Sequence, residues 1–388
     1  MLRIEGGICA VPGVLAAGAR QGKYGVALIK AAGEAAGMFT TNKVRAAPLD
    51  ITAEHLAAFG RLEGIIANSG CANAYTGLRG LEDARYMARL LGDFLAADEK
   101  KIAVASTGVI GRYMDMALIR SLFDEAKGRL RSDPDASAEA ARAIMTTDTR
   151  VKEIAVEHKG LRVAGIVKGA GMIEPNMATM LCFLYTDADL AADALKDCLK
   201  EAVRDSFNML TVDGDTSTND AVLLTATGKI QCRIEDFREA LAFVCIELAR
   251  MMARDGEGAS KYFETVVSGA RNDADARLAA KAVARSSLVK TAVCGADPNW
   301  GRIIAAVGYS GAEMDPDRIS LGLEGKGIEV SLVKNGRIAD GVLSKAKEIM
   351  LGDAITINVD LGLGAAKARS FGCDLTHSYV DINANYTT

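Results

Sequence analysis

A threonine stands where a loop containing glycine and proline meets an apolar run of strand character. Residues 168–188 read KGAGMIEPNMATMLCFLYTDA, with Thr179 directly after the small residue Ala178. Threonine is common in strands and alanine fits a tight corner, so the pair is consistent with an ordinary strand start. The alternative interpretation is that the peptide bond between Ala178 and Thr179 is broken, which makes Thr179 a new N-terminus.

An N-terminal threonine carries its own base. An α-amino group titrates near ~7.7, close to the pH at which it must accept the hydroxyl proton. This pairing activates a hydroxyl without a histidine and leads to an acyl-enzyme. Cleavage would begin with attack of the Thr179 hydroxyl on the preceding carbonyl, giving an ester that water opens. Local composition alone leaves both interpretations of Thr179 open.

Two glycine-rich turns contain groups that such an acyl transfer needs. Residues 103–111, AVASTGVIG, read as a strand entering a turn that can aim backbone N–H groups and the Thr107 hydroxyl at one oxygen. Negative charge that develops on a carbonyl oxygen needs such donors, and removing one costs roughly 10²–10³ in rate. Residues 255–261, DGEGASK, place Glu257 between two glycines. Taken alone, each motif is more often a turn than a site.

Other catalytic arrangements are missing from the sequence. None of His55, His158 and His377 lies in a nucleophile motif or has zinc-ligand spacing; we expect His55 on a helix surface and His158 in a hairpin turn. Residues 212–220, VDGDTSTND, resemble a calcium loop, but Leu224 stands where its last acidic ligand belongs. A turn rich in Asx hydrogen bonds is the better interpretation. No phosphate-loop motif is complete, so we expect neither a metal nor a cofactor.

The bulk composition narrows the class of protein. The chain has 388 residues, a net charge of −4 and no dense block of lysine and arginine, which argues against a nucleic-acid partner. Glycine and proline interrupt the apolar N-terminal segment, so we expect neither a signal peptide nor a membrane span, and a cytoplasmic protein. Eight cysteines without CxxC spacing predict reduced, mostly buried thiols.

The elements that must position these residues follow from hydrophobic patterning. Strand-like runs occur at residues 24–31, 64–68, 101–106, 162–169, 179–186, 221–228 and 261–269. Helical periodicity occurs at residues 81–97, 116–130, 190–207, 234–253 and 274–286. Several strands come in adjacent pairs, such as 151–156 with 161–167. This favours an α/β protein built as an α+β layered sandwich with mixed sheets over a doubly wound parallel sheet.

Segments spread along the whole chain resemble those of the glutamate/ornithine N-acetyltransferase family of arginine biosynthesis. Residues 168–188 are one of these segments, and all of them occur in the order expected for the family. The others are ANSGCANAYTG (67–77), ASTGVIG (105–111), IMTTDT (144–149), TVDGDTSTND (211–220), RDGEGASK (254–261), GADPNWGRI (295–303) and HSYVDINANYTT (377–388). A resemblance of this extent is highly specific.

The resemblance implies self-cleavage and a particular architecture. In that family the precursor cuts itself at an Ala–Thr bond, which here is Ala178–Thr179. Residues 1–178 and 179–388 would then be an α and a β chain that form one intertwined catalytic unit. Family members assemble as α2β2 heterotetramers, and their layered fold is reminiscent of N-terminal-nucleophile hydrolases.

The resemblance also implies roles for individual residues. Thr179 would be the nucleophile, and Thr107 with Gly108 would form the oxyanion hole. The substrate contacts would be Thr146, Lys168, Thr179, Glu257, Asn383 and Thr388. A cation such as Lys168 suits an α-carboxylate, and a carboxylate such as Glu257 can hold an amine. Thr147 is adjacent to Thr146, and the choice between the two stays open.

The implied reaction is a ping-pong acetyl transfer from N2-acetyl-L-ornithine to L-glutamate through acetyl-Thr179. Some members also use acetyl-CoA as donor, and no motif in this sequence separates the two kinds of enzyme. The alternative is a self-processing aminopeptidase or amidase of related fold, which would pass the acyl group to water. Residues 379–388 alternate like a strand, and because Thr388 is assigned to the site, we expect a C-terminal extension to impair substrate binding.

Overall fold

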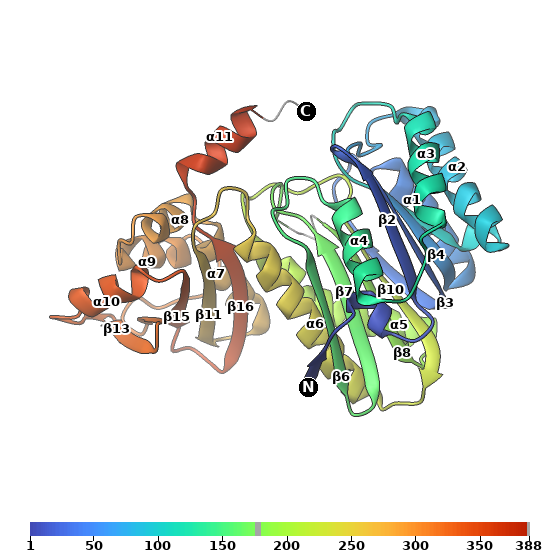
Figure 1. Cartoon of the computed structure of the whole chain (residues 1–388). Helices are drawn as coiled ribbons and strands as arrows, with labels where there is room; N and C mark the ends of the chain where they lie inside the picture. The colour runs from blue at the N-terminus through green and yellow to red at the C-terminus, as the bar shows by residue number, and fades with distance from the viewer. Residues whose placement is uncertain (175–179, 386–388) are drawn as a thin grey trace.

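Two mixed sheets and their helices make up the protein (Figure 1). The structure, a computed structural model, describes residues 1–174 and 180–385. Within these residues the larger sheet has nine strands in the order β1-β6-β7-β8-β10-β3-β4-β5, with β2 also paired to β3. Its strands are β1 (Leu2–Ile4), β2 (Leu15–Gln21), β3 (Tyr24–Phe39), β4 (Arg61–Ser69), β5 (Ile102–Ser106), β6 (Lys152–His158), β7 (Leu161–Lys168), β8 (Leu181–Ala188) and β10 (Ala221–Ile230).

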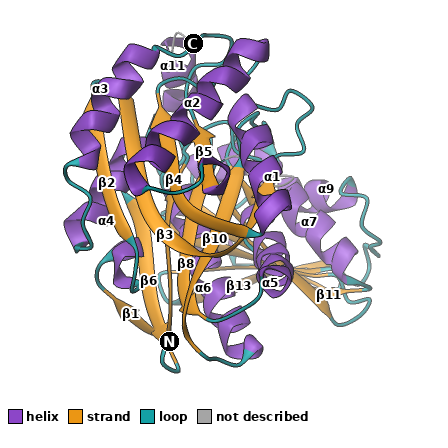
Figure 2. Cartoon of the chain, turned by 90° about the vertical axis from the view of Figure 1, so that its right-hand side faces the viewer, coloured by secondary structure: helices purple, strands orange, loops and turns teal. Residues whose placement is uncertain are grey.

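The larger sheet curls into two stacked layers. The first part of β3 pairs with β2 and β4, its last part pairs with β10, and Figure 2 shows how strongly the strand curves. Successive residues on one strand therefore point into different apolar clusters. Phe183 and Leu223 join Ile29 between the two layers, whereas their neighbours Leu184 and Leu224 face the helices outside. The predicted layered sandwich with mixed sheets is confirmed.

Helices cover both outer faces of this sandwich. α1 (Ala47–Phe59), α2 (Gly77–Leu95) and α3 (Met116–Lys127) pack on the layer of β2–β5, and α5 (Ala192–Asp205) and α6 (Ile234–Arg254) pack on the other layer. α4 (Pro134–Ile144) packs on β2 and β3. It begins at Asp133, whose carboxylate accepts a 2.8 Å hydrogen bond from the Ala136 N–H, with Pro134 in the first turn. The loop 145–151 follows the end of α4 and leads to β6.

The smaller sheet packs against the opposite side of α6 (Figure 1). In the described residues its order is β14-β13-β12-β15-β11-β16-β9. The strands are β9 (Leu210–Thr211), β11 (Tyr262–Ala270), β12 (Ser320–Gly325), β13 (Ile328–Lys334), β14 (Arg337–Ile338), β15 (Ala354–Asp360) and β16 (Ala366–Cys373). The remaining helices are α7 (Asp273–Arg285), α8 (Ser287–Cys294), α9 (Trp300–Gly308), α10 (Leu343–Met350) and α11 (His377–Asn385).

Helix α6 joins the two sheets into one core. Phe237, Leu241, Val244 and Leu248 recur at helical spacing and are fully buried. Complete burial of such side chains stabilises the fold by about 1.5–3 kcal/mol each. Apart from the C-terminal segment, the predicted helices and strands occur; most of their ends agree within a few residues, but β3 continues to Phe39. Of the expected strand 179–186, residue 179 lies outside the described residues.

Two expectations about local structure are wrong. The C-terminal segment predicted as a strand is helix α11, because residues 377–385 have no neighbouring strand edge in the described chain and their amides bond back along a helix instead. Asn383 Nδ2 donates to the Tyr379 carbonyl at 3.0 Å, for example. His55 lies on a helix as expected, but it is buried, because α1 packs on β5 and the His55 Nδ1 hydrogen-bonds the Ile102 carbonyl at 2.8 Å.

The cysteines agree with the expectation drawn from their spacing. All eight are free thiols, and five of them are buried: Cys71, Cys182, Cys198, Cys245 and Cys373. Over the described residues, no helix combines the length and the apolar character needed to cross a bilayer.

Candidate active site

A cavity of about 290 Å³ lies at the ends of several strands of the larger sheet, beside the loop after α6. Its walls are the turn after β5, the loop after α4, the end of β7, the starts of β8 and β10, and the loop after α6. Every described residue assigned to the site from sequence lines it: Thr107, Gly108, Thr146, Lys168, Glu257 and Asn383. Thr147 lines it too, so the choice between Thr146 and Thr147 stays open.

Three of the residues singled out from sequence lie outside the described residues. These are Ala178, Thr179 and Thr388. Met180, which follows Thr179 in the sequence, is buried and lines the cavity. The described residue that follows the candidate nucleophile in sequence is therefore part of the cavity wall.

The turn after β5 presents two donors to the cavity. The Thr107 N–H is already bonded to the Asn68 carbonyl at 3.0 Å, which leaves the Thr107 hydroxyl and the Gly108 N–H. Gly108 has φ of 128°, and a Cβ there would lie 2.4 Å from the backbone carbon of Gly70, so only glycine fits. A hydroxyl and a backbone N–H in the wall of one cavity are donors of the kind that a developing oxyanion requires.

Buried amides hold this turn in place. Asn219 Nδ2 donates to the carbonyls of Ala72 at 2.5 Å and Ser106 at 2.8 Å, and the Ser106 hydroxyl donates to Asn68 Oδ1 at 2.6 Å. All three side chains are fully or almost fully buried. This support was not predicted from the sequence. The available signal was the polar residues Asn68 and Ser106 directly after the apolar runs 64–67 and 102–105.

Lys168 ends β7 with its ammonium in the cavity wall. It is 8% exposed, and its Nζ donates to Thr107 Oγ1 at 3.1 Å. Burial lowers the pKa of Lys168, and repulsion from Lys152 acts in the same direction, while the nearby carboxylates of Asp148, Glu257 and others oppose the shift. An incoming carboxylate would favour the charged form of this lysine.

A buried ion network lies behind Lys168. The Asp148 carboxylate accepts hydrogen bonds from Lys152 Nζ and the Gly169 N–H, both at 2.6 Å, and from the Thr146 N–H at 3.0 Å. Burial alone would raise the pKa of Asp148, but the charges of Lys168 and Lys152 and these hydrogen bonds lower it to about 2. Asp148 is therefore a carboxylate that fixes the Thr146 loop against the end of β7.

The same network reaches the loop after α6. Lys152 Nζ lies 2.5 Å from Asp255 Oδ2, and the Thr149 N–H donates to that carboxylate at 3.1 Å. Lys152 is thus completely buried between two carboxylates, Asp148 and Asp255. Sequence reasoning missed both acids as supporting groups, although they lie in the TTDT and DGEG segments.

Glu257, two residues after Asp255, also lines the cavity. Its N–H bonds the Ala170 carbonyl at 2.9 Å, and a Cβ on Gly171 would lie 2.2 Å from its carboxyl carbon. Asn383 Nδ2, on α11, donates to Glu257 Oε2 at 2.8 Å. The C-terminal helix is in this way attached to the cavity through a carboxylate assigned to the site.

Asp220 is a second acid in the wall and was also missed from sequence. It is 1% exposed, and burial raises its pKa well above the ordinary value, more than its hydrogen bonds and Lys168 lower it. Among the described residues its Oδ2 has no hydrogen-bond partner. The N–H of the next residue, Ala221, bonds the Met180 carbonyl at 2.9 Å and so fixes the start of β8 against β10.

The segment that resembles a calcium loop is a turn. The Asp213 carboxylate accepts hydrogen bonds from the backbone N–H groups of Met172 at 2.6 Å, Ile173 at 2.8 Å and Asp215 at 3.2 Å. These bonds use the acceptor groups that a cation would need, and they join residues 171–174 to the loop before β10. The interpretation as a turn rich in Asx bonds is confirmed.

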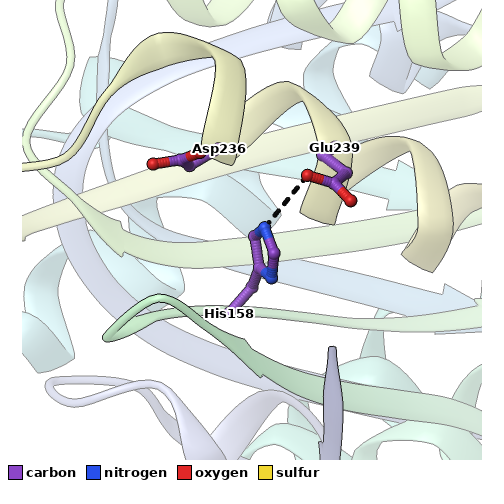
Figure 3. A group of neighbouring side chains, drawn as sticks. All are labelled: His158, Asp236 and Glu239. Atoms are coloured by element: carbon purple, nitrogen blue, oxygen red, sulfur yellow. Dashed lines mark hydrogen bonds and ion pairs between the residues drawn. The ribbon is translucent and has the colours of Figure 1, made fainter.

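A separate group of titratable side chains lies at the β6–β7 hairpin (Figure 3). His158 Nε2 and Glu239 Oε2, on α6, are 3.1 Å apart, and Asp236 is a turn away along the helix. The Lys159 ammonium lies 2.7 Å from the Asp236 carboxylate, and Glu239 is largely exposed. These contacts attach the hairpin to α6, and His158 lies at the hairpin end as expected.

Comparison with known proteins identifies the family. The model of the ArgJ family matches residues 12–388. The chain is 53% identical over 396 residues, covering all of both, to a protein of Methanosarcina mazei named glutamate N-acetyltransferase. It is 50% identical to the Archaeoglobus fulgidus protein named arginine biosynthesis bifunctional protein ArgJ, over 97% of this chain and 99% of that one. A crystal structure of argJ from Bacillus halodurans matches with TM-score 0.50 and 40% identity, over 53% of this chain and 98% of that chain. The chain belongs to the ArgJ family.

Proposed function

We propose that the protein is a glutamate N-acetyltransferase of arginine biosynthesis that transfers acetyl from N2-acetyl-L-ornithine to L-glutamate. The observation that carries this proposal is the cavity that holds Thr107, Lys168 and Glu257. Met180, the residue after Thr179, lines the same cavity. The names of relatives at 53% and 50% identity support the activity and the pathway.

Self-cleavage creates the nucleophile in this proposal. The Thr179 hydroxyl attacks the Ala178 carbonyl carbon, the amide nitrogen leaves as the amine, and water then hydrolyses the ester. The products are a free Ala178 carboxylate and a Thr179 with a free hydroxyl and α-amine. The sheet supports a stable pair of chains, 1–178 and 179–388, because β7 from before the break pairs antiparallel with β8 from after it.

The acetyl transfer then has two balanced half-reactions. The Thr179 amine takes the hydroxyl proton as the oxygen attacks the acetyl carbonyl carbon of acetylornithine. The Thr107 hydroxyl and the Gly108 N–H stabilise the tetrahedral oxyanion, which collapses and expels ornithine with the proton. The glutamate amine next attacks the acetyl-Thr179 ester, N-acetylglutamate leaves, and the hydroxyl regains its proton.

The charges around the cavity suit an amino-acid substrate. Lys168 is placed to bind the α-carboxylate, and Glu257 to bind an amine, with Asn383 orienting the Glu257 carboxylate. Thr146 or Thr147 supplies a hydroxyl from the neighbouring loop. Thr388 is proposed as the last substrate contact, on the basis of the family resemblance.

Three finer features belong to the same proposal. The processed chains assemble as an α2β2 heterotetramer, acetyl-CoA serves as a second acetyl donor, and the enzyme works in the cytoplasm. Light scattering of the processed protein tests the assembly. Formation of N-acetylglutamate from acetyl-CoA and glutamate, without acetylornithine, tests the second donor.

An isotope experiment tests the reaction itself. In one arm, purified protein is incubated with acetyl-labelled N2-acetylornithine and glutamate; in the other, with unlabelled N2-acetylornithine and labelled ornithine, without glutamate. The proposal predicts labelled N-acetylglutamate in the first arm and labelled N2-acetylornithine in the second, because a ping-pong enzyme needs no glutamate to reach acetyl-Thr179. Label released only as acetate would instead indicate an amidase, and no exchange without glutamate would contradict the ping-pong order.

A further inference from the structure

A second, larger cavity of about 880 Å³ lies beside the candidate active site. It is bounded by the end of α5, by α7, by the start of α8 and by the residues after α9. Its volume is within the range of about 300–1,000 Å³ typical of pockets for small molecules. Among the described residues, none that is assigned to the reaction proposed above lines it.

The charged lining of this cavity is strongly biased toward cations. In the described part of the lining the basic residues are Arg204, Arg277, Lys281 and Arg285, and the acid is Glu174. Arg285 Nε lies 3.2 Å and Lys281 Nζ 3.8 Å from the Glu174 carboxylate. The Glu174 carboxylate therefore faces two cations, and it also accepts a hydrogen bond from the Thr211 hydroxyl at 3.1 Å.

The other two cations share one carboxylate outside the lining. Asp205 pairs with Arg277 and, at 3.0 Å, with Arg204. Arg277 also donates to the Arg204 carbonyl at 2.9 Å, which holds its guanidinium in place. The four cations around the cavity are thus paired with two carboxylates, Glu174 and Asp205. Burial and the neighbouring Arg285 lower the pKa of Lys281.

The N-terminus of α8 adds partial positive charge at the same place. Ser286, its N-cap, and Ser287 both line the cavity. Peptide N–H groups at a helix start favour a bound anion, and guanidinium groups match phosphate and carboxylate oxygens in pairs. We propose that this cavity is a binding site for a small polyanion that carries two or more phosphoryl or carboxylate groups.

The two cavities share a wall. Residues 171 and 172 line the active-site cavity and Glu174 lines the second one; likewise Gly214 and Thr216 line the second cavity and residues 217–220 the first. The two wall segments are bonded together, because the Glu174 N–H donates to the Asp215 carbonyl and the Thr216 hydroxyl donates to the Glu174 carbonyl, both at 2.8 Å. A polyanion bound to Lys281 and Arg285 would compete with Glu174 for these two cations, and Glu174 belongs to the shared wall.

Calorimetric titration tests the site without relying on catalysis. The probes are pyrophosphate and citrate, each at constant ionic strength, against the full-length protein. The test variant is Arg204→Gln with Arg285→Gln, whose side chains are 55% and 61% exposed, so the fold should tolerate the change. The matched control is Arg318→Gln with Arg337→Gln, two exposed arginines outside both cavities.

The proposal predicts saturable binding of at least one probe by the wild type and the control, weakened at least tenfold in the test variant. Stronger binding of pyrophosphate would identify a phosphoryl ligand, and stronger binding of citrate a carboxylate ligand. Absence of saturable binding for both probes, or equal binding by the test variant with an unchanged Tm, would overturn the proposal. Neither result bears on the acetyl transfer.

Discussion

The ammonium of Lys168 donates a hydrogen bond to the hydroxyl oxygen of Thr107 across 3.1 Å, joining the end of β7 to the turn after β5. Because the lysine occupies an acceptor position of that oxygen, the hydroxyl proton remains available to another acceptor. Lys168 thus positions one of the two donors proposed for the oxyanion, in addition to its proposed contact with the substrate carboxylate.

Replacing Lys168 tests this double role. We expect Lys168→Met to lower kcat/KM for acetyl transfer by roughly 10²-fold, the scale of a misplaced catalytic group. Lys168→Arg, which keeps the charge, should retain more activity. Because burial lowers the pKa of Lys168, its ammonium loses a proton, as the pH rises, at a lower pH than an ordinary lysine. The wild type should therefore lose activity with rising pH before the ordinary lysine range is reached, and Lys168→Arg should not. Lys196→Met, an exposed lysine on α5, is the control; wild-type kinetics for Lys168→Met would contradict the role.

The Asp148 carboxylate should contribute stability that depends on pH. Its folded-state pKa is lowered from 3.8 to about 2, so its contribution is present above pH 4 and is lost as the pH falls toward 2. The shift corresponds to roughly 2 kcal/mol. We expect Asp148→Asn to lower the free energy of unfolding by roughly 3 kcal/mol at pH 7, because Lys152 loses one of its two partners.

Chemical unfolding at several pH values checks this prediction. The difference between wild type and Asp148→Asn should shrink by roughly 2 kcal/mol between pH 6 and pH 2. Asp197→Asn, on the exposed surface of α5, should leave stability nearly unchanged. A constant difference across the whole range would show that Asp148 is not the depressed carboxylate described here.

Substitutions at two glycines of the same turn distinguish the effect of steric crowding from the effect of backbone strain. Gly108 and Gly111 both have positive φ, 128° and 76°, but only at Gly108 would a Cβ meet backbone atoms, 2.4 Å from Gly70. We expect Gly111→Ala to cost about 1 kcal/mol from the φ alone. Gly108→Ala should displace the turn and lower kcat by at least 10²-fold. Steady-state kinetics and Tm measured for Gly108→Ala and Gly111→Ala test this prediction. Similar kcat values for the two variants would contradict the special role of Gly108.

The C-terminal helix should influence substrate affinity. Asn383 on α11 holds the Glu257 carboxylate at 2.8 Å, so Asn383→Ala should raise KM several-fold with little change in kcat. Residues added after Thr388 should raise KM in the same way. The control is Asn385→Ala, which removes an amide that donates to the Asp381 carbonyl at 2.8 Å along the same helix. Unchanged KM values for both the extended protein and Asn383→Ala would contradict the assignment of this terminus to the site.

Much of the fold follows from local patterning. The apolar runs around Leu184 and Leu224 predicted strands, and the 3.6-residue spacing of Phe237, Leu241 and Val244 predicted α6. Alternation failed at the C-terminus, because a short alternating segment forms a strand only beside another strand, and residues 377–385 have no such neighbour in the described chain. The burial of His55 was hidden for a similar reason, since which face of α1 meets β5 depends on tertiary packing.

Some residues of the candidate site could likewise be predicted from the sequence, and others could not. Thr107, Gly108 and Glu257 stand in glycine-rich turns whose composition suggested chemistry, and the structure places all three at one cavity. Asp148 and Lys152 could not be assigned from sequence, because their importance comes from burial together and not from spacing. Asp220 likewise looks like an ordinary turn residue until the layers bring it beside Lys168.

Intact-mass analysis of purified wild type and Thr179→Ala tests the central claim most directly. The account predicts that the wild type gives two chains, 1–178 and 179–388, and that Thr179→Ala gives one uncut chain of 388 residues. Copurification of the two wild-type chains is expected, because β7 and β8 pair across the break. A wild-type protein that stays whole while it transfers acetyl groups would contradict the N-terminal nucleophile.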